Sequence, residues 1–443
     1  SRGFNPVADL ALAGAGLRLL AGAIGILPVL LAIAAALLAV AAVAAALWWA
    51  TGVLARLAPG RTALRGAAGI GALACAGVPG AAFTARVAVE RASLARGTLA
   101  ELAAFRAAAA TDPFAGAGGL LDLIDRDVLL VFVESYGRTS HDTPLYADLH
   151  RATLAGGEAR LAARGLAMAS GYLASPTRGG QSWLAHATVA NGLWIDGQIR
   201  YRAVLASRRK TLFHLAQGAG FHTAAVMPQI TMEWPEADRM GFDTVLPAAD
   251  LGYRGRPFNW VTMPDQFTFT ALDRLLRSGP RDRRLLVQVA TGTSHAPWVP
   301  VPDLIPWEAL GDGRVFDAVA QSGDPPEVVW RDRDRVRAQY RLAVDYALRT
   351  VLAYAERHAD DPPLMVVLGD HQAAGFVALD ERPDVPLHVI GPAHLVDRLR
   401  AEGLAPGLIP PADAPVPAMD GLRDMLLRAF SSVPPEAVGA AAP

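Results

Sequence analysis

The hydrophobic and polar positions divide the chain into an apolar amino-terminal part and a mixed remainder. Residues 19–55 include no charged side chain and consist mainly of Ala, Leu, Val and Ile, with Trp48 and Trp49 near the end of the run. A helix needs about 20 apolar residues to cross a bilayer, and tryptophans gather at the membrane interface. The pattern therefore predicts one long or tilted transmembrane helix. A soluble alanine-rich hairpin is the alternative, and the length of the run argues against it.

A second uncharged run covers residues 66–85 and predicts a second span, although it is rich in Gly and Ala and contains Pro79. The loop between the two runs carries three arginines and no acid, which places it in the cytoplasm by the positive-inside rule. Both flanks then face outward. The sequence thus predicts a membrane region over residues 1–86 with about two spans, a helical connector over 87–120 and a large domain over 121–435.

Within the large domain, short apolar runs alternate with amphipathic stretches, a pattern typical of α/β proteins. Buried parallel strands are predicted over residues 128–133, 223–227, 285–290 and 364–368, with a further one over 387–390. Helices are predicted around residues 212–219, 267–276 and 335–357, with a short one near 419–430. We therefore expect a mostly parallel sheet flanked by helices.

Composition narrows the classes of partner. The chain has 41 basic and 42 acidic residues, a net charge of −1, so no overall field favours nucleic acid, and attachment to a membrane must be hydrophobic. The single cysteine, Cys75, excludes an intrachain disulfide and argues against a thiolate metal site or a cysteine nucleophile.

Polar side chains follow three of the predicted strands, where open parallel sheets bind their ligands. They are Glu134 and Ser135 after the first strand, Thr291, Thr293 and His295 after the third, and Asp370 and His371 after the fourth. Taken alone, a strand-end Glu is usually a solvated loop residue, and an Asp-His pair can be a turn with a helix cap. Taken together, carboxylates and imidazoles at one sheet edge favour a site for Mn²⁺, Zn²⁺ or Mg²⁺.

The stretch SPTRGGQSWLAHAT, residues 175–188, places Ser182 after a glycine pair and at the start of a predicted helix. A helix start offers free N–H groups to an oxyanion, although serine there is also a common N-cap. As a fourth metal ligand, Ser182 would gain a lowered pKa and become a nucleophile. Thr177, in the preceding turn, is the alternative nucleophile. His186 lies on the same helix face one turn on, where a core or capping role is favoured.

These motifs resemble, in order, the sulfatase and alkaline-phosphatase superfamily. The matching positions are Glu134 in FVES, the helix start at Ser182, His295 in SHAPW, and Asp370-His371 in GDH. The nearer resemblance is to membrane-anchored phosphoglycerol and phosphoethanolamine transferases of the lipoteichoic acid synthase type. In those enzymes the nucleophile is a Thr, followed about nine residues on by an Asn-small-Leu-aromatic group. Here Asn191-Gly192-Leu193-Trp194 stands nine residues after Ser182.

The resemblance implies an enzyme of the multi-pass type in the inner (cytoplasmic) membrane, with its catalytic domain on the periplasmic side. It would hold one divalent ion, Mn²⁺ or Zn²⁺ with Mg²⁺ also compatible, through Glu134, Ser182, Asp370 and His371. Ser182 and His295 would be catalytic and the substrate a phospholipid or another phospho- or sulfo-ester. The substrate-binding residues would be Thr177, Arg178, Trp234, Arg239 and His295.

The departures from the family keep alternatives open. Glu236 stands where these transferases carry a phosphate-binding Arg, so Arg239 or Arg178 would have to replace it, and a non-catalytic envelope-assembly protein is one alternative. A phosphodiesterase, phosphatase or sulfatase-like hydrolase of the same fold is another. The sequence after Ser182 lacks the Pro and Arg that formylglycine formation requires, which disfavours a true sulfatase.

Overall fold

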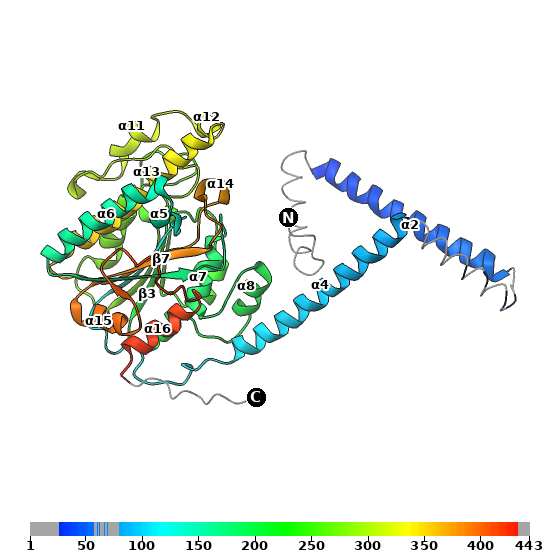
Figure 1. Cartoon of the computed structure of the whole chain (residues 1–443), viewed down its shortest axis with the longest axis horizontal. Coiled ribbons are helices and arrows are strands. Elements are labelled where there is room, and N and C mark those ends of the chain that lie inside the picture. The colour runs from blue at the N-terminus through cyan, green and yellow to red at the C-terminus, as the bar shows by residue number, and fades with distance from the viewer. Residues whose placement is uncertain are drawn as a thin grey trace. The chain divides into compact units, whose positions relative to one another are not determined.

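The computed structural model of the protein describes residues 26–56 and 79–432, together with residues 60, 62, 66 and 69. The chain forms two compact units, residues 1–105 and 106–443 (Figure 1). The first contains helix α2 (Ile26–Arg56) and most of helix α4 (Pro79–Ala110). Over Leu27–Val53, α2 has a mean hydropathy of 2.8, and it is the one described helix long and apolar enough to cross a membrane. The long helix expected over residues 19–55 is therefore present from residue 26.

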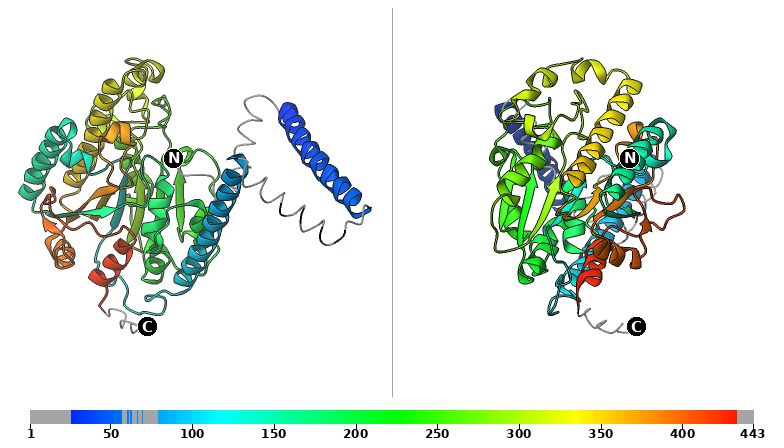
Figure 2. Two further views of the ribbon diagram at one scale, coloured as in Figure 1. Left: turned by 45° about the vertical axis from the view of Figure 1, so that its right-hand side comes forward. Right: turned by 90° about the vertical axis from the view of Figure 1, so that its left-hand side faces the viewer.

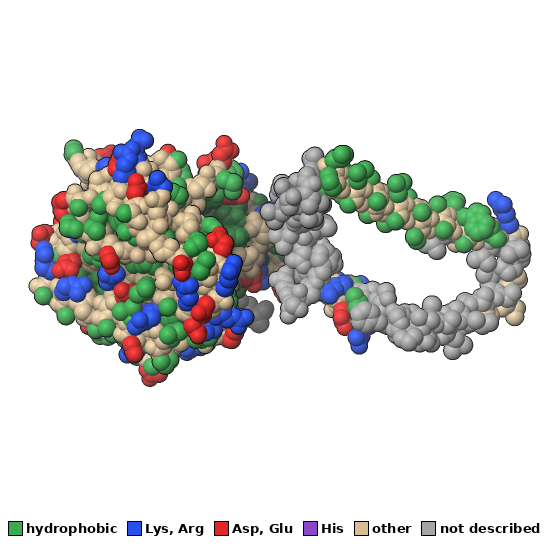
Figure 3. Space-filling view, turned by 90° about the horizontal axis from the view of Figure 1, so that it is seen from above, with side chains coloured by type: hydrophobic (Ala, Val, Ile, Leu, Met, Phe, Trp, Pro, Cys, Tyr) green, Lys and Arg blue, Asp and Glu red, His purple; other side chains and the backbone are tan. Residues whose placement is uncertain are grey.

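The second predicted span, residues 66–85, lies largely outside the described residues. Residues 87–110 of the predicted helical connector form the greater part of α4. The side chains of Trp48 and Trp49 are exposed on α2, and Figure 3 shows apolar side chains along the whole described length of that helix. Charged side chains of both signs are spread over the second unit in the same view, in keeping with the near-zero net charge.

The second unit is built on an eight-stranded sheet with the strand order β4-β3-β5-β1-β6-β7-β2-β8. Its strands are β1 (Val128–Val133), β2 (Ala167–Ala174), β3 (His222–Met227), β4 (Thr244–Pro247), β5 (Leu285–Ala290), β6 (Leu364–Gly369), β7 (Asp384–Gly391) and β8 (Ala405–Pro406). The five strands from β4 to β6 run parallel to one another. The mostly parallel α/β fold expected from the sequence is confirmed.

One strand direction was predicted wrongly. The run at residues 387–390 belongs to β7, which pairs antiparallel with β6 and with β2 instead of adding another parallel strand. Only the segment around the short helix α14 (Gly375–Ala378) connects β6 to β7, and a connection without a long crossover helix favours an antiparallel neighbour. Strands β2, β4 and β8 have no counterpart among the predictions.

Two helical layers cover the sheet (Figure 2). One layer packs on alternate residues of β1, including Leu129 and Val131, and contains α6 (Pro144–Ala163), α10 (Asp265–Leu272) and α13 (Arg333–Arg357). The other packs on Leu130 and Phe132 and contains α7 (Ser182–Asn191), α9 (Leu212–Gly218), α15 (Ala393–Ala401) and α16 (Gly421–Phe430). Burial of β1 on both faces explains its uninterrupted apolar sequence. The four predicted helices match α9, α10 with the π-helical turn Asp273–Arg277, α13 and α16.

The shorter described helices are α5 (Thr139–Asp142), α8 (Gln198–Leu205), α11 (Asp317–Ala320) and α12 (Pro326–Val329). Short 3₁₀ turns occur at Pro235–Arg239, Ala248–Leu251, Trp307–Ala309 and Arg314–Phe316.

A buried arginine fixes the end of α7. Arg423 of α16 is fully buried, donates to the carbonyl oxygen of Asn191 at 2.7 Å and pairs with Asp112 at 2.6 Å. A cation is favourable at a helix C-terminus, where carbonyl groups lack partners. Because α7 starts at Ser182, anchoring its far end also fixes the position of that serine.

Candidate active site

Three neighbouring strands bring polar side chains to one edge of the sheet. Strand β1 lies between β5 and β6, and the register pairs Phe132 with Ala290 and Val133 with Gly369. The next residues are therefore adjacent. The backbone N–H of Glu134 donates to Thr291 Oγ1 at 3.1 Å, and that of Ser135 donates to Asp370 Oδ1 at 2.8 Å.

Glu134, Asp370 and His371 form a buried cluster at this edge. One ligand atom of each lies within 4.8 Å of the others. His371 Nε2 is 3.3 Å from Glu134 Oε1 and 3.9 Å from Asp370 Oδ1. His371 Nδ1 lies 3.0 Å from the carbonyl oxygen of Gln372, which can only accept, so Nδ1 carries a proton and Nε2 is the nitrogen that faces the cluster.

Ser182 enters the same cluster from helix α7. The turn before it has positive φ at Gly179 (71°), Gly180 (137°) and Gln181 (67°), a conformation in which glycine carries no steric cost. The N–H of Gly179 donates to the carbonyl oxygen of Gln372 at 2.7 Å, which holds the turn beside His371. Ser182 Oγ donates to Glu134 Oε2 at 2.9 Å and lies 3.3 Å from His371 Nε2. The structure thus brings Glu134, Ser182, Asp370 and His371 together.

Burial and mutual charge shift the pKa of each ionisable group in the cluster. Burial, reinforced by the nearby Glu134 carboxylate, raises the pKa of Asp370 to about 8. Burial alone would lower the pKa of His371, but Asp370 and Glu134 outweigh it and raise that pKa to about 9. Burial opposes ionisation of Glu134, yet chiefly the charge of His371 holds its pKa below the usual range. At neutral pH the three groups therefore share two protons and carry no net charge.

This cluster fits a divalent cation. Two carboxylates, one imidazole and one hydroxyl supply three oxygen donors and one nitrogen donor, which suit Zn²⁺ or Mn²⁺. A cation with two charges can replace the two protons without leaving net charge in a buried site. Among the described residues, this is the one group of three or more acidic or histidine side chains with suitably close ligand atoms.

Comparison with known families identifies the family of the chain. The model of the family described as Sulfatase matches residues 126–384, more than half of the 443-residue chain. The chain belongs to the sulfatase family. The resemblance to the sulfatase and alkaline-phosphatase superfamily is thus confirmed, and the matched segment contains Glu134, Ser182, His295, Asp370 and His371.

Several solved structures are similar to this sulfatase-family chain. LtaP, a lipoteichoic acid synthase from Listeria monocytogenes, is 13% identical with a TM-score of 0.46, covering 75% of this chain and 78% of that one. The soluble domain of lipooligosaccharide phosphoethanolamine transferase A from Neisseria meningitidis is 12% identical with a TM-score of 0.45, covering 71% and 89%. The Streptococcus pyogenes phosphoglycerol transferase GacH, in complex with sn-glycerol-1-phosphate, is 12% identical with a TM-score of 0.43, covering 75% and 91%. No curated protein sequence matches the chain.

His295 lies in the loop after β5, half-buried. Its Nδ1 is 2.6 Å from the carbonyl oxygen of Ala296, so Nδ1 carries a proton and Nε2 is left for another partner. Burial raises the pKa of Glu134, and the charge of His371 and, to a smaller extent, that of His295 lower it. His295 is thus close to the cluster but is not among the side chains whose ligand atoms lie close enough together to share one ion, which are Glu134, Asp370 and His371.

The Thr177 and Arg178 side chains differ in their surroundings. Thr177 is buried, and its Oγ1 has no hydrogen-bond partner among the described residues. The loop that contains Thr177 folds back against the cluster of Glu134, Asp370 and His371, since Arg178 forms a parallel β-bridge with Gln372. The Arg178 guanidinium pairs with Glu381 at 2.6 Å in an exposed position. Arg178 is therefore engaged at the surface and would have to leave Glu381 to grip a phosphate.

The segment after β3 carries the other predicted substrate residues. Trp234 is partly buried, and its ring centroid lies 6.1 Å from that of Phe242. Arg239 is exposed at the end of the 3₁₀ turn Pro235–Arg239, and Glu236 is half-buried in the same turn. Packing against Phe242 explains the position of the Trp234 ring. No described contact links Arg239 to Ser182.

His186 packs in the core as its helical position suggested. It is buried, with its ring centroid 4.1 Å from that of Phe132, and its Nε2 has no partner among the described residues. Burial lowers its pKa to about 4, so the ring is neutral at pH 7.

Sequence reasoning missed Asp265, a fully buried carboxylate at the start of α10. Its Oδ1 accepts from the N–H groups of Gly292 and Thr293 at 2.6 and 2.9 Å, in the loop that leads to His295. An Asp after Pro264 at a helix start resembles an ordinary capping residue, so the sequence carries no signal of this contact.

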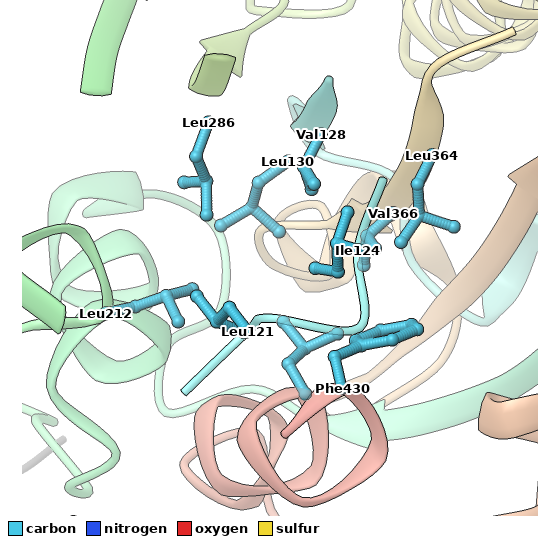
Figure 4. Close-up of a pocket in the computed structure, with 10 residues that line it drawn as sticks. Leu121, Ile124, Val128, Leu130, Leu212, Leu286, Leu364, Val366 and Phe430 are labelled. Carbon is cyan, nitrogen blue, oxygen red and sulfur yellow. The ribbon is translucent and has the colours of Figure 1, made fainter. Parts of the chain in front are cut away.

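An apolar cavity at the opposite edge of the sheet offers no such chemistry (Figure 4). It is lined by ten apolar side chains, among them Val128 and Leu364 at the amino ends of β1 and β6 and Phe430 of α16. Because catalysis requires polar groups, the polar edge at the carboxyl ends of the strands is the candidate site.

Proposed function

We propose that this sulfatase-family protein is a membrane-anchored, metal-dependent transferase that moves a phosphoglycerol or phosphoethanolamine head group from a phospholipid to an acceptor in the cell envelope. The observation that carries the proposal is the Ser182 hydroxyl, 2.9 Å from Glu134 and 3.3 Å from His371 at the first turn of α7. The head-group class rests on the motif resemblance, and helix α2 supports a lipid donor because anchoring raises the local concentration of head groups.

The ligands in this proposal are Glu134, Ser182, Asp370 and His371, holding one Mn²⁺ or Zn²⁺, with Mg²⁺ also compatible. Such an ion would lower the pKa of the Ser182 hydroxyl and offset negative charge on the phosphoryl oxygens. The N–H groups at the start of α7 would stabilise the same oxygens. The catalytic domain would lie on the periplasmic side of the inner membrane.

Ser182 loses its hydroxyl proton to solvent before the reaction, and in the first step its Oγ forms a bond to phosphorus, while the bond between phosphorus and the glycerol oxygen of diacylglycerol breaks. His295 Nε2 donates a proton to that leaving oxygen. In the second step the acceptor hydroxyl gives its proton to His295 and forms the new bond to phosphorus, and Ser182 leaves as the deprotonated oxygen that entered the first step. Thr177, with its unpartnered hydroxyl, and an arginine, Arg178 or Arg239, would contact the head group together with Trp234.

The test uses the full chain with phosphatidylglycerol or phosphatidylethanolamine that carries a labelled head group, in the presence of Mn²⁺ or Zn²⁺. We expect diacylglycerol release that a chelator abolishes, with the label on the protein or on an added acceptor. Free glycerol phosphate or phosphoethanolamine as the main product would identify a hydrolase instead. No diacylglycerol from either lipid would contradict the proposal.

A further inference from the structure

Asp265 forms hydrogen bonds with the loop that follows β5. The residue is fully buried, and one carboxylate oxygen, Oδ1, accepts from two successive backbone groups, Gly292 N–H at 2.6 Å and Thr293 N–H at 2.9 Å. In return, the N–H of Asp265 donates to Thr293 Oγ1 at 3.0 Å. Hydrogen bonds to an ionised group are stronger than those between neutral groups, so the two bonds to Oδ1, with the third beside them, hold the loop to the start of α10.

The loop held in this way connects the cluster to His295. At one end the Thr291 hydroxyl accepts from the N–H of Glu134 at 3.1 Å. At the other, the N–H of His295 donates to the carbonyl oxygen of Gly292 at 3.0 Å, closing a turn directly on the residue that Asp265 binds. An added Cβ at Gly292 would meet the end of the Gln229 side chain, which would have to move. The turn that carries His295 is therefore held at Gly292 and Thr293 by Asp265.

We infer that Asp265 is a positioning residue for His295: through Gly292 and Thr293 it sets where the His295 imidazole meets the leaving oxygen. The inference deepens the proposed function and rests on the role given there to His295. The side chain is fully buried and its second oxygen, Oδ2, has no partner among the described residues, so the contacts that Asp265 makes with the loop are those of Oδ1 and its own N–H.

This geometry separates the effects of two substitutions. Asp265→Asn keeps an oxygen that can accept from both N–H groups, whereas Asp265→Ala leaves Gly292 and Thr293 without a partner. We expect Asp265→Ala to lower kcat on the phospholipid that the parent consumes by about 10- to 100-fold, the range that a misplacement near 1 Å can produce, with KM changed by less than about threefold. Asp265→Asn should keep kcat within about threefold of the parent, and the metal content of both variants should equal that of the parent.

A matched control and a double-variant cycle complete the test. Asp273→Ala removes a carboxylate bonded to Tyr354 at 2.6 Å and His358 at 2.8 Å, away from the loop, and should leave kcat unchanged. In the His295→Ala background, Asp265→Ala should lower kcat by less than about twofold, because the imidazole that Asp265 positions is already absent. An equal loss of kcat in both backgrounds, or an Asn variant as impaired as the Ala variant, would overturn the inference.

Hydrogen exchange gives a readout that needs no substrate. Asp265→Ala should speed exchange of the Gly292 and Thr293 amides, and Asp265→Asn should not; unchanged exchange in the Ala variant would refute the anchoring. If the parent consumed neither phospholipid, the proposed function would fail, while this comparison would still decide whether Asp265 holds the loop.

Discussion

Binding of a metal ion should release about two protons from the cluster at pH 7. Burial and the Glu134 charge raise the pKa of Asp370 to about 8, and the two carboxylates raise that of His371 to about 9 against the effect of burial. Both sites are then more than nine-tenths protonated at pH 7, and both must lose their proton to bind a metal ion, for a total of about 1.9 protons. With ordinary pKa values the same residues would release only about 0.2 proton, all from His371.

The assay is isothermal titration calorimetry with Zn²⁺ or Mn²⁺ at pH 7 in buffers of different ionisation enthalpy. The Ser182→Ala variant is used so that ionisation of the serine does not add to the count. By linkage, the affinity should also rise by roughly 100-fold per pH unit around pH 7 and level off above pH 9, where the apo cluster has lost its protons. Release of 0.2 proton with a flat affinity profile would refute the charge-balanced, buried cluster on which the metal assignment depends.

Other predictions follow from single contacts. An Asp370→Ala, His371→Ala double variant should bind no stoichiometric metal ion, and full metal content measured by elemental analysis would remove these ligands from the assignment. His295→Ala should lose about 10²- to 10⁴-fold in turnover of the phospholipid, as expected for a general acid, yet keep its metal ion; loss of the ion would refute this role. Burial lowers the pKa of His150 to about 4. At a pH below about 6.5, the pKa of the unfolded histidine, unfolding therefore takes up a proton, and the free energy of unfolding falls as pH drops. The His150→Phe variant should therefore lose about 1 kcal/mol less of its unfolding free energy than the parent between pH 7.5 and 5.5 in urea titrations, and equal losses would show that His150 is not buried as a neutral ring.

The sequence predicted the part of the fold that lies closest to the site. Strands β1, β5 and β6 are long apolar runs followed at once by polar residues, so their type and the placement of Glu134 and Asp370 could be read from pattern. Ser182 could be placed because a glycine pair and an apolar run mark a helix start. In contrast, β2 consists largely of small residues in AMASGYLA, and β4 has four residues at the sheet edge. Neither has a distinctive hydrophobic period.

Features set by distant partners could not be predicted. The direction of β7 depends on the connection from β6 and on pairing with β2, more than 200 residues earlier in the chain, and not on the residues of β7 itself. Arg178 was a candidate for binding phosphate, but its partner Glu381 comes from a loop 203 residues away. Asp265 acts on a loop 27 residues further on. Such contacts depend on tertiary packing, which local pattern does not encode.

The central claim is that Ser182, activated within this cluster, carries the transferred head group. The most direct measurement is peptide mass spectrometry of the full chain after brief incubation with Zn²⁺ or Mn²⁺ and a phospholipid labelled in its head group. A phosphoglycerol or phosphoethanolamine adduct should map to Ser182 in the parent, be absent from Ser182→Ala and persist in Thr177→Ala. An adduct on Thr177 that survives in the Ser182→Ala protein and disappears from Thr177→Ala would contradict the account.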